Sequence, residues 1–329
     1  MTWRWNREGE ADHTARSGSG DLDDSELPLR NIVLPASAPR TSRILALYFF
    51  AVLIGGSLLA PQIFHALSLG NAAAFPNLAI RVFAITALLG LIVVLRQFRF
   101  SGAETWGYAL PLPQGIRSIA IGFAFGLLSM GMVVALEIAL GLQVRDEARY
   151  PVSMLIAAID GCLVGFGVAL VEETFFRGGL QSAFSRADVA GAGVWMTAVV
   201  YALAHLLDDD IVIGEVNWLS GFRILAAAIM ALAEPGIYGA LLTLFLVGVV
   251  LALIRQFLGH INLCIGLHAG WVAVIQWARK AYGLNDAHPL AWLVSDAYDG
   301  IIGYLAAAML MGLLAASWLW FARHPGKGG

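Results

Sequence analysis

The sequence predicts an all-α fold, a polytopic bundle of about eight transmembrane helices. Composition carries much of this prediction: 59% of the 329 residues are hydrophobic and only 13% are charged, whereas an average soluble domain is about 25% charged. The mean hydropathy of +0.75 is typical of an integral membrane protein. The third observation is the recurrence of apolar windows about 20 residues long, the length that an α-helix needs to cross the hydrocarbon core.

The apolar windows follow one another along most of the chain. They cover residues 43–68, 78–97, 115–142, 153–182, 189–207, 236–258, 261–280 and 299–322. The fourth and fifth are short or interrupted by polar residues, which is typical of helices that line a cavity. We therefore expect a membrane domain at 41–329, with its polar motifs concentrated in a core at 153–280.

The first 40 residues differ from the rest, because they are polar and rich in Asp, Glu, Ser, Gly and Arg. They contain no apolar stretch of the kind that a cleavable signal peptide carries. Such a composition cannot bury enough apolar surface to offset the entropy lost on ordering. We expect residues 1–40 to form a disordered cytoplasmic tail.

An even number of spans puts both termini on one side of the membrane, and the basic residues indicate which side. If the N-terminus is cytoplasmic, the outer segments hold six of the 20 basic residues and the inner segments hold the other 14. The six are Arg81, Arg145, Arg149, Arg223, Arg279 and Lys280. We therefore expect an integral protein of a bacterial inner membrane with both termini in the cytoplasm.

The longest expected loop, about 208–235, separates the fifth and sixth windows. It begins with three aspartates at 208–210 and continues with an amphipathic stretch at 222–232. We interpret it as a solvated acidic loop followed by an interfacial helix. An acidic lid that collects a metal ion is the alternative.

Two further features narrow the class of protein. Cys162 and Cys264 both lie in apolar windows, so we interpret them as small core residues and not as a disulfide or a metal pair. The net charge of −3 is too small to indicate a nucleic-acid partner.

Charged residues inside the fourth window are the most informative feature of the chain. Glu172, Glu173 and Arg177 lie within six positions of an apolar stretch. A charge near the middle of a membrane helix costs about 2.5–3.5 kcal/mol on insertion scales, unless it is paired and faces a wet interior. We therefore expect these residues to serve chemistry or transport. The alternative is a Glu–Arg ion pair that has only a structural role and holds two helices together.

Helix geometry predicts different roles for these three residues. Glu173 and Arg177 form an i, i+4 pair with the glutamate on the N-terminal side, the better orientation for an ion pair. Glu172 is rotated by about 100°, which leaves it free for a reacting group. Gly178 and Gly179 follow directly and allow close approach of another helix or of substrate.

Two histidines in other windows complete the set. Tyr201-Ala-Leu-Ala-His205 lies in the fifth window, and His268 lies in the seventh, in Gly266-Leu-His268-Ala-Gly-Trp271. A lone histidine in a span is usually a satisfied interhelical hydrogen-bonding residue. A carboxylate and two imidazoles in one membrane cavity could instead hydrolyse an amide, the carboxylate taking a proton from water and a histidine stabilising the oxyanion.

These motifs resemble those of the type II CAAX prenyl protease family, also called the CPBP family of intramembrane proteases. Glu172-Glu173-Thr-Phe-Phe-Arg177 matches the Glu-Glu-x-x-x-Arg motif of that family. Tyr201-Ala-Leu-Ala-His205 is similar to Phe-x-x-x-His, with Tyr in place of Phe. The third motif is His-x-x-x-Asn or Asp; here it begins at His268 and ends at Val272, which departs from the pattern.

The resemblance implies an intramembrane endopeptidase of the glutamic type, with a membrane-associated peptide or protein as substrate. Glu172 would activate water, His205 would assist it, and His268 would stabilise the oxyanion. Glu173, Arg177 and Tyr201 would support the site.

The substitution at Val272 removes the side-chain donor that the family is thought to use. The role could pass to His268 alone, to the Trp271 indole or to Gln276, and activity could be attenuated, because one oxyanion donor is typically worth about 10²–10³ in rate.

The resemblance implies that the protein needs no cofactor. A glutamate and two histidines are also a zinc ligand set with an open fourth position, so Glu172, His205 and His268 would be the ligands if zinc is bound.

Two other functions stay open at this stage. Val272 motivates a non-proteolytic protein of the same fold, such as a bacteriocin self-immunity factor or a scaffold. Intramembrane carboxylates also relay protons in transporters, but we find no inverted repeat with polar residues in matching positions.

Overall fold

The computed structural model describes residues 38–98, 102–145, 154–185, 191–207 and 211–323. All of these belong to one compact unit, Ser37–Gly329. The predicted tail lies outside the described residues except for its last three positions, and so do the aspartates at 208–210.

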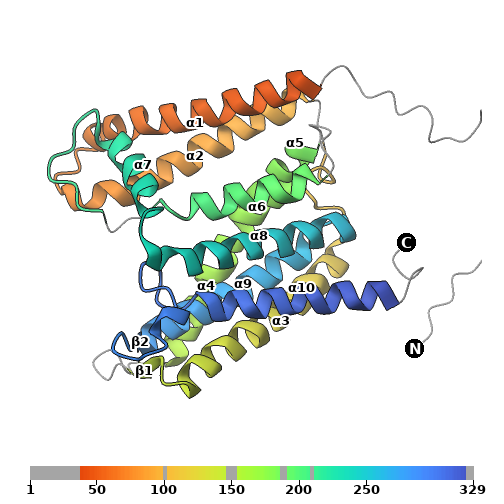
Figure 1. Cartoon of the computed structure of the whole chain (residues 1–329). Helices are drawn as coiled ribbons and strands as arrows, with labels where there is room; N and C mark the ends of the chain where they lie inside the picture. Colours follow the sequence, from red (N-terminus) through yellow and green to blue (C-terminus); the bar gives the residue numbers. More distant parts are fainter. Residues whose placement is uncertain (1–37, 99–101, 146–153, 186–190, 208–210, 324–329) are drawn as a thin grey trace, which may run out of the picture. The chain divides into compact units, whose positions relative to one another are not determined.

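Every predicted apolar window contains a helix, so the all-α membrane bundle is confirmed (Figure 1). The helices in these windows are α1 (Ala38–Ala66), α2 (Phe75–Gln97), α3 (Leu112–Ala139), α4 (Met154–Glu173), α5 (Gln181–Ser185), α6 (Ala192–Ala204), α8 (Tyr238–Leu258), α9 (Asn262–Ala281) and α10 (Tyr304–Arg323). The amphipathic stretch predicted to be helical is α7 (Ser220–Ala231). Single 3₁₀ turns occur at Ala72–Ala74, Pro235–Ile237 and Ala291–Leu293.

Five helical segments of the described part are long and apolar enough to cross a membrane. They are α1, α2, α3, α8 and the continuous segment Met154–Ser185 that contains α4 and α5. The helix α6 has only 13 residues, and at 1.5 Å per residue it reaches about 20 Å, less than the ~30 Å hydrocarbon core. It ends directly before His205, whose side chain is 20% exposed.

The ends of the described chain agree with an even number of crossings. The start of α1 and the end of α10 lie at the same end of the bundle (Figure 1). A two-stranded antiparallel sheet lies at the other end, where β1 (Gln143–Arg145) pairs with β2 (Tyr282–Leu284). This pair continues α3 and α9 beyond the helical bundle. It was not predicted, since three residues are too few to show a strand pattern.

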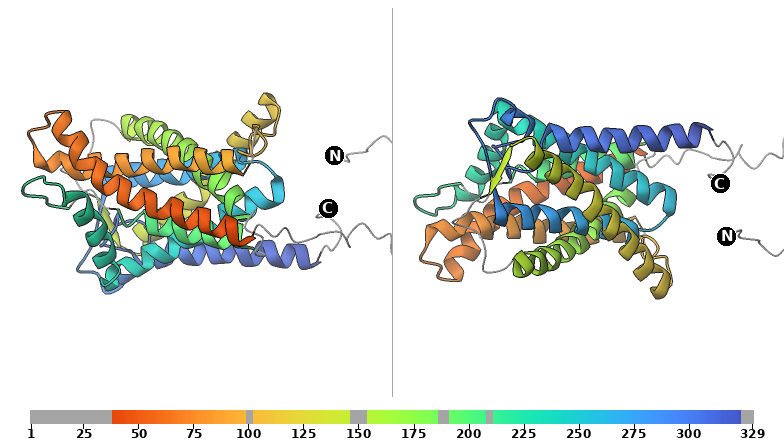
Figure 2. Two further views of the ribbon diagram at one scale, coloured as in Figure 1. Left: turned by 90° about the horizontal axis from the view of Figure 1, so that it is seen from above. Right: turned by 90° about the horizontal axis from the view of Figure 1, so that it is seen from below.

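The helix α9 packs between α3 and α4, and glycines make both contacts close (Figure 2). Gly266 on α9 lies so near α3 that a Cβ atom would be 2.0 Å from the carbonyl oxygen of Ile119. Gly165 on α4 lies similarly close to α9, since its Cβ would be 2.5 Å from the carbonyl oxygen of Ala269. The spacing of four residues between such glycines, as at Gly122–Gly126, is typical of tightly packed membrane helices. This packing fixes α9, and with it His268, against α4.

Gly266→Ala is therefore expected to lower the free energy of unfolding by about 1–3 kcal/mol, the usual range for overpacking. The atom that the new Cβ would meet belongs to the backbone of α3 and cannot rotate away as a side chain could. The measurement is the thermal unfolding midpoint in detergent. Gly131→Ala on α3 is the matched control: no atom lies within 4 Å of the place that its Cβ would occupy, and a helical Gly→Ala change is neutral or stabilising there. Equal midpoints for both variants would contradict the close α3–α9 contact.

Candidate active site

The two adjacent glutamates lie where the helix changes its winding. Glu172 and Glu173 end α4, and a π-helical segment, Thr174–Leu180 (η3), follows without a break and leads into α5. In this segment the backbone N–H of Gln181 bonds to the carbonyl oxygen of Phe176, five residues back. Short π-helical insertions of this kind are rare and are frequent at functional sites.

Glu173 lies on the inner side of this turn and is fully buried, as is Arg177. Arg177 Nη1 donates to Glu173 Oε1 at 2.8 Å, which is the i, i+4 pair that the spacing predicts. His268 Nδ1 lies 2.8 Å from the same oxygen. The guanidinium carbon of Arg177 also lies 4.4 Å from the centroid of the Tyr201 ring, a cation–π geometry. Glu173 therefore joins α4, η3 and α9 in one buried polar cluster.

Glu172 lies on the other side of the turn, and its side chain remains 26% exposed. Its Oε2 atom is 3.9 Å from the Nε2 atom of His205 and 3.9 Å from the Nε2 atom of His268. These distances are too long for direct hydrogen bonds, and Oε2 itself is buried without a hydrogen-bond partner among the described residues. His205 and His268, which follow Glu172 by 33 and 96 positions in the chain, thus both face one oxygen of its carboxylate.

The partners of the two imidazoles define their tautomers. His205 Nδ1 lies 2.8 Å from the carbonyl oxygen of Tyr201, and because a carbonyl only accepts, this nitrogen carries a proton. His268 Nδ1 donates to the Glu173 carboxylate by the same reasoning. In the neutral state of each ring, the Nε2 lone pair therefore points toward Glu172. His268 can donate from Nε2 only as an imidazolium.

Tyr201 forms one wall of this cluster and is almost fully buried. Its ring centroid is 4.4 Å from that of His205 and 5.0 Å from that of Phe176, where the two rings meet edge to face. The phenyl ring of the family motif and the phenol ring here can fill the same space, so the Tyr-for-Phe difference keeps the packing that orients His205.

The structure narrows the options for the missing donor at Val272. Trp271 Nε1 donates to Ser129 Oγ on α3 at 2.9 Å, so the indole N–H has a partner already. Val272 itself is partly buried on α9 and has no polar side-chain atom. Gln276 lies two turns beyond His268. Ser129 was missed by sequence reasoning, since it lies 142 residues away from Trp271.

Zinc fits the donor chemistry of the site but not its spacing. Two imidazoles whose Nδ1 atoms are held by a carbonyl and a carboxylate are typical of zinc ligands. In a tetrahedral site with bonds of 2.0–2.1 Å, however, ligand atoms lie about 3.3 Å apart, and the observed 3.9 Å is wider. No group of three His, Cys, Asp or Glu side chains in the described residues is arranged to hold a metal ion.

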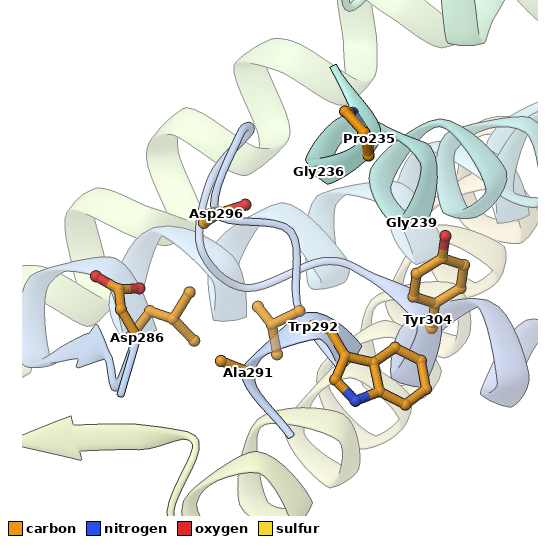
Figure 3. A pocket seen from close by; sticks show the side chains of 10 residues that line it. Pro235, Gly236, Gly239, Asp286, Ala291, Trp292, Asp296 and Tyr304 are labelled. Carbon is orange, nitrogen blue, oxygen red and sulfur yellow. The ribbon is translucent and has the colours of Figure 1, made fainter. Parts of the chain in front are cut away.

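A separate cavity of ≈ 430 Å³ lies at the end of the bundle that carries the strands (Figure 3). It is lined by residues of the loops that flank α8 and α10, including Trp292, Asp296 and Tyr304. Neither Glu172 nor the two histidines that face its carboxylate line this cavity. Asp296 lies beside Gly236 at the amino end of α8, where a carboxylate complements the helix dipole. The cavity therefore does not belong to the candidate active site.

Comparison with known proteins identifies the segment that carries this site. Residues 153–274 match a family model described as type II CAAX prenyl endopeptidase Rce1-like. This segment is similar to that family. The resemblance that the motifs predict is thereby confirmed over a stretch that contains Glu172, His205 and His268 and that includes the departing position Val272. No curated protein and no solved structure matches the chain.

The Rce1-like match and the apolar helices together support a membrane protein related to peptidases. At this coarse level, the match and the helices imply that the protein lies in a lipid bilayer and has a membrane-associated substrate.

Proposed function

We propose that the protein is an intramembrane endopeptidase in which Glu172 activates a water molecule to hydrolyse a peptide bond. The observation that supports this most is the convergence of Glu172 Oε2 with the Nε2 atoms of His205 and His268, each at 3.9 Å. Three segments of chain contribute one group each, and all three lie in the Rce1-like segment.

The tautomers suggest how the water is held. One hydrogen of the water bonds to Glu172 and the other to the Nε2 lone pair of His205, so an oxygen lone pair is directed at the substrate. Glu172 takes a proton as the oxygen attacks the carbonyl carbon. His268, as an imidazolium, donates from Nε2 to the carbonyl oxygen as it gains charge. When the C–N bond breaks, protonated Glu172 gives its proton to the leaving nitrogen; the second water proton stays on the new carboxyl group and then passes to the amine, so that a carboxylate and an ammonium leave.

The buried cluster behind these groups has a supporting role in the proposal. Glu173 accepts hydrogen bonds from both Arg177 and His268. It thereby fixes the orientation of the His268 ring. Val272 leaves His268 as the side-chain donor nearest the reaction, and we expect turnover to be slow in comparison with a site that carries a second donor.

The test uses purified protein in proteoliposomes with two probes, a farnesylated peptide ending in a CAAX sequence and a non-lipidated single-span peptide. Cleavage of either probe by the wild type, and of neither by Glu172→Ala, supports the proposal. The preferred probe reports whether the substrate is prenylated. Cleavage of both by Glu172→Ala at the wild-type rate would reject it.

A non-proteolytic role in the same fold, as in bacteriocin self-immunity or as a scaffold, is the second candidate, and Val272 is the observation that favours it. A protection phenotype in cells that survives both Glu172→Gln and His205→Ala, together with no cleavage by the wild type, would select this candidate.

Chelation separates the metal-free mechanism from a zinc-dependent one. We expect hydrolysis to persist after dialysis against 1,10-phenanthroline, because the 3.9 Å separations around Glu172 Oε2 are wider than those between the ligands of a tetrahedral zinc ion. The measurement pairs the rate with zinc content by mass spectrometry of the purified protein. Loss of activity on chelation, restored by zinc at one ion per chain, would establish the zinc mechanism instead.

A further inference from the structure

The loop that joins α2 to α3, described from residue 102 to residue 111, lies directly against the π-helical segment η3. Its residue Trp106 packs on the two glycines of that segment: a Cβ on Gly178 would be 2.8 Å from the Trp106 carbonyl oxygen, and one on Gly179 would be 3.0 Å from its ring. The close approach that Gly178 and Gly179 allow is therefore made by this α2–α3 loop, together with Leu91 of α2.

One hydrogen-bond chain runs from the loop to the base of the site. Thr174 Oγ1 donates to the carbonyl oxygen of Leu170 at 2.6 Å, and a carbonyl can only accept. The single hydroxyl hydrogen of Thr174 is thus committed. Tyr108, whose Oη lies 2.5 Å from Thr174 Oγ1, must therefore be the donor in that contact. The order is Tyr108 to Thr174 to Leu170.

This chain ends where the α-helix changes into the π-helix. Thr174 is the first residue of η3 and follows Glu173 directly. Leu170 lies one turn earlier, beside the pair of glutamates. A backbone that leaves α-helical geometry loses the regular pairing of its carbonyl groups, and a Thr hydroxyl that bonds to the carbonyl four residues back often bends the helix at that point. The position of Tyr108 thus bears on how Glu172 and Glu173 are directed.

We propose that Tyr108 is a positioning residue, which holds the α-to-π transition so that Glu172 faces the two histidines. The proposal rests on the proposed peptidase function. The loop lies outside the matched segment at 153–274, so the match assigns no role to it. Tyr108 acts through Thr174 and touches neither Glu172 nor a reacting atom.

Other contacts hold the loop in place when the Tyr108 hydroxyl is removed. Ser182 Oγ donates to the carbonyl oxygen of Thr105 at 3.0 Å, and Arg255 Nη2 donates to that of Glu104 at 3.3 Å. Tyr108→Phe therefore deletes one donor at Thr174 and leaves the loop attached. The loss acts on the geometry of the turn and not on the anchoring of the loop.

The experiment measures kcat and KM for Tyr108→Phe in proteoliposomes, with the cleaved probe peptide as substrate. We expect kcat to fall about tenfold, the equivalent of one net hydrogen bond, with KM changed by less than about twofold. Because Tyr108 and Thr174 act through one bond, the double variant Tyr108→Phe/Thr174→Val should be no slower than Thr174→Val alone. Ser182→Ala, which removes one of the other two loop contacts, is the control and should keep the wild-type kcat.

Hydrogen exchange supplies a readout that does not depend on turnover. Tyr108→Phe should speed amide exchange at residues 170–180, with little change at 154–168 and no such effect in Ser182→Ala. If the wild type hydrolyses neither probe, the peptidase proposal fails while this exchange result still decides whether Tyr108 holds the turn. Unchanged exchange, an unchanged kcat in an active protein, or additive losses in the double variant would each overturn the role of Tyr108.

Discussion

Glu172→Gln is expected to lower kcat for peptide hydrolysis by about 10²–10⁴-fold, the usual contribution of a general base. The amide has nearly the same shape as the carboxylate but cannot take a proton from water. Because Glu172 has no direct hydrogen bond to either imidazole, its replacement should leave the fold intact. The measurement is the cleavage rate in proteoliposomes, with the thermal midpoint of the variant recorded alongside.

The matched control is Glu234→Gln, which changes an exposed carboxylate in the turn before α8. It should cleave as fast as the wild type. If Glu172→Gln also retains wild-type kcat, the carboxylate is not the base and the proposed mechanism is wrong.

Arg177→Met is expected to reduce the free energy of unfolding by about 3–5 kcal/mol, the range for breaking a buried ion pair by removing one partner. Arg177 and Glu173 are both fully buried, so the carboxylate would lose its cation where water cannot replace it. Thermal or denaturant unfolding in detergent measures the effect. The cleavage rate should fall as well, since His268 takes its orientation from Glu173.

The double variant Glu173→Gln/Arg177→Met separates charge from packing. It removes both charges and should recover part of the stability that Arg177→Met loses, because no unpaired charge stays buried. A buried ion pair at this position would be contradicted if Arg177→Met were as stable as the wild type. It would also be contradicted if the double variant lost more free energy of unfolding than Glu173→Gln and Arg177→Met lose together.

Much of the architecture was predictable, because it depends on local patterns. Apolar length determined the helices, and each predicted window contains one. The i, i+4 spacing of Glu173 and Arg177 predicted their ion pair. The Gly-x-x-x-Gly spacings at Gly122–Gly126 and Gly161–Gly165 carried a further signal, since they mark the helix faces that α9 packs against.

Other features depend on contacts between distant parts of the chain, which one sequence does not encode in any local pattern. The π-helical turn after Glu173 has no residue signature that separates it from an α-helix. The contact of Tyr108 with Thr174 spans 66 positions, and that of Trp271 with Ser129 spans 142. The tautomers of His205 and His268 likewise follow from partners that only the fold brings near.

In the proposed mechanism, a water molecule held by Glu172 and His205 attacks the peptide bond directly. The most direct measurement follows hydrolysis of the cleaved probe peptide in H₂¹⁸O, with mass spectrometry of both product and protein. We expect ¹⁸O in the new carboxyl terminus, no covalent adduct on the protein during turnover, and product formation about 10²–10⁴-fold slower in Glu172→Gln. A trapped acyl adduct, or labelled product from Glu172→Gln at the wild-type rate, would contradict it.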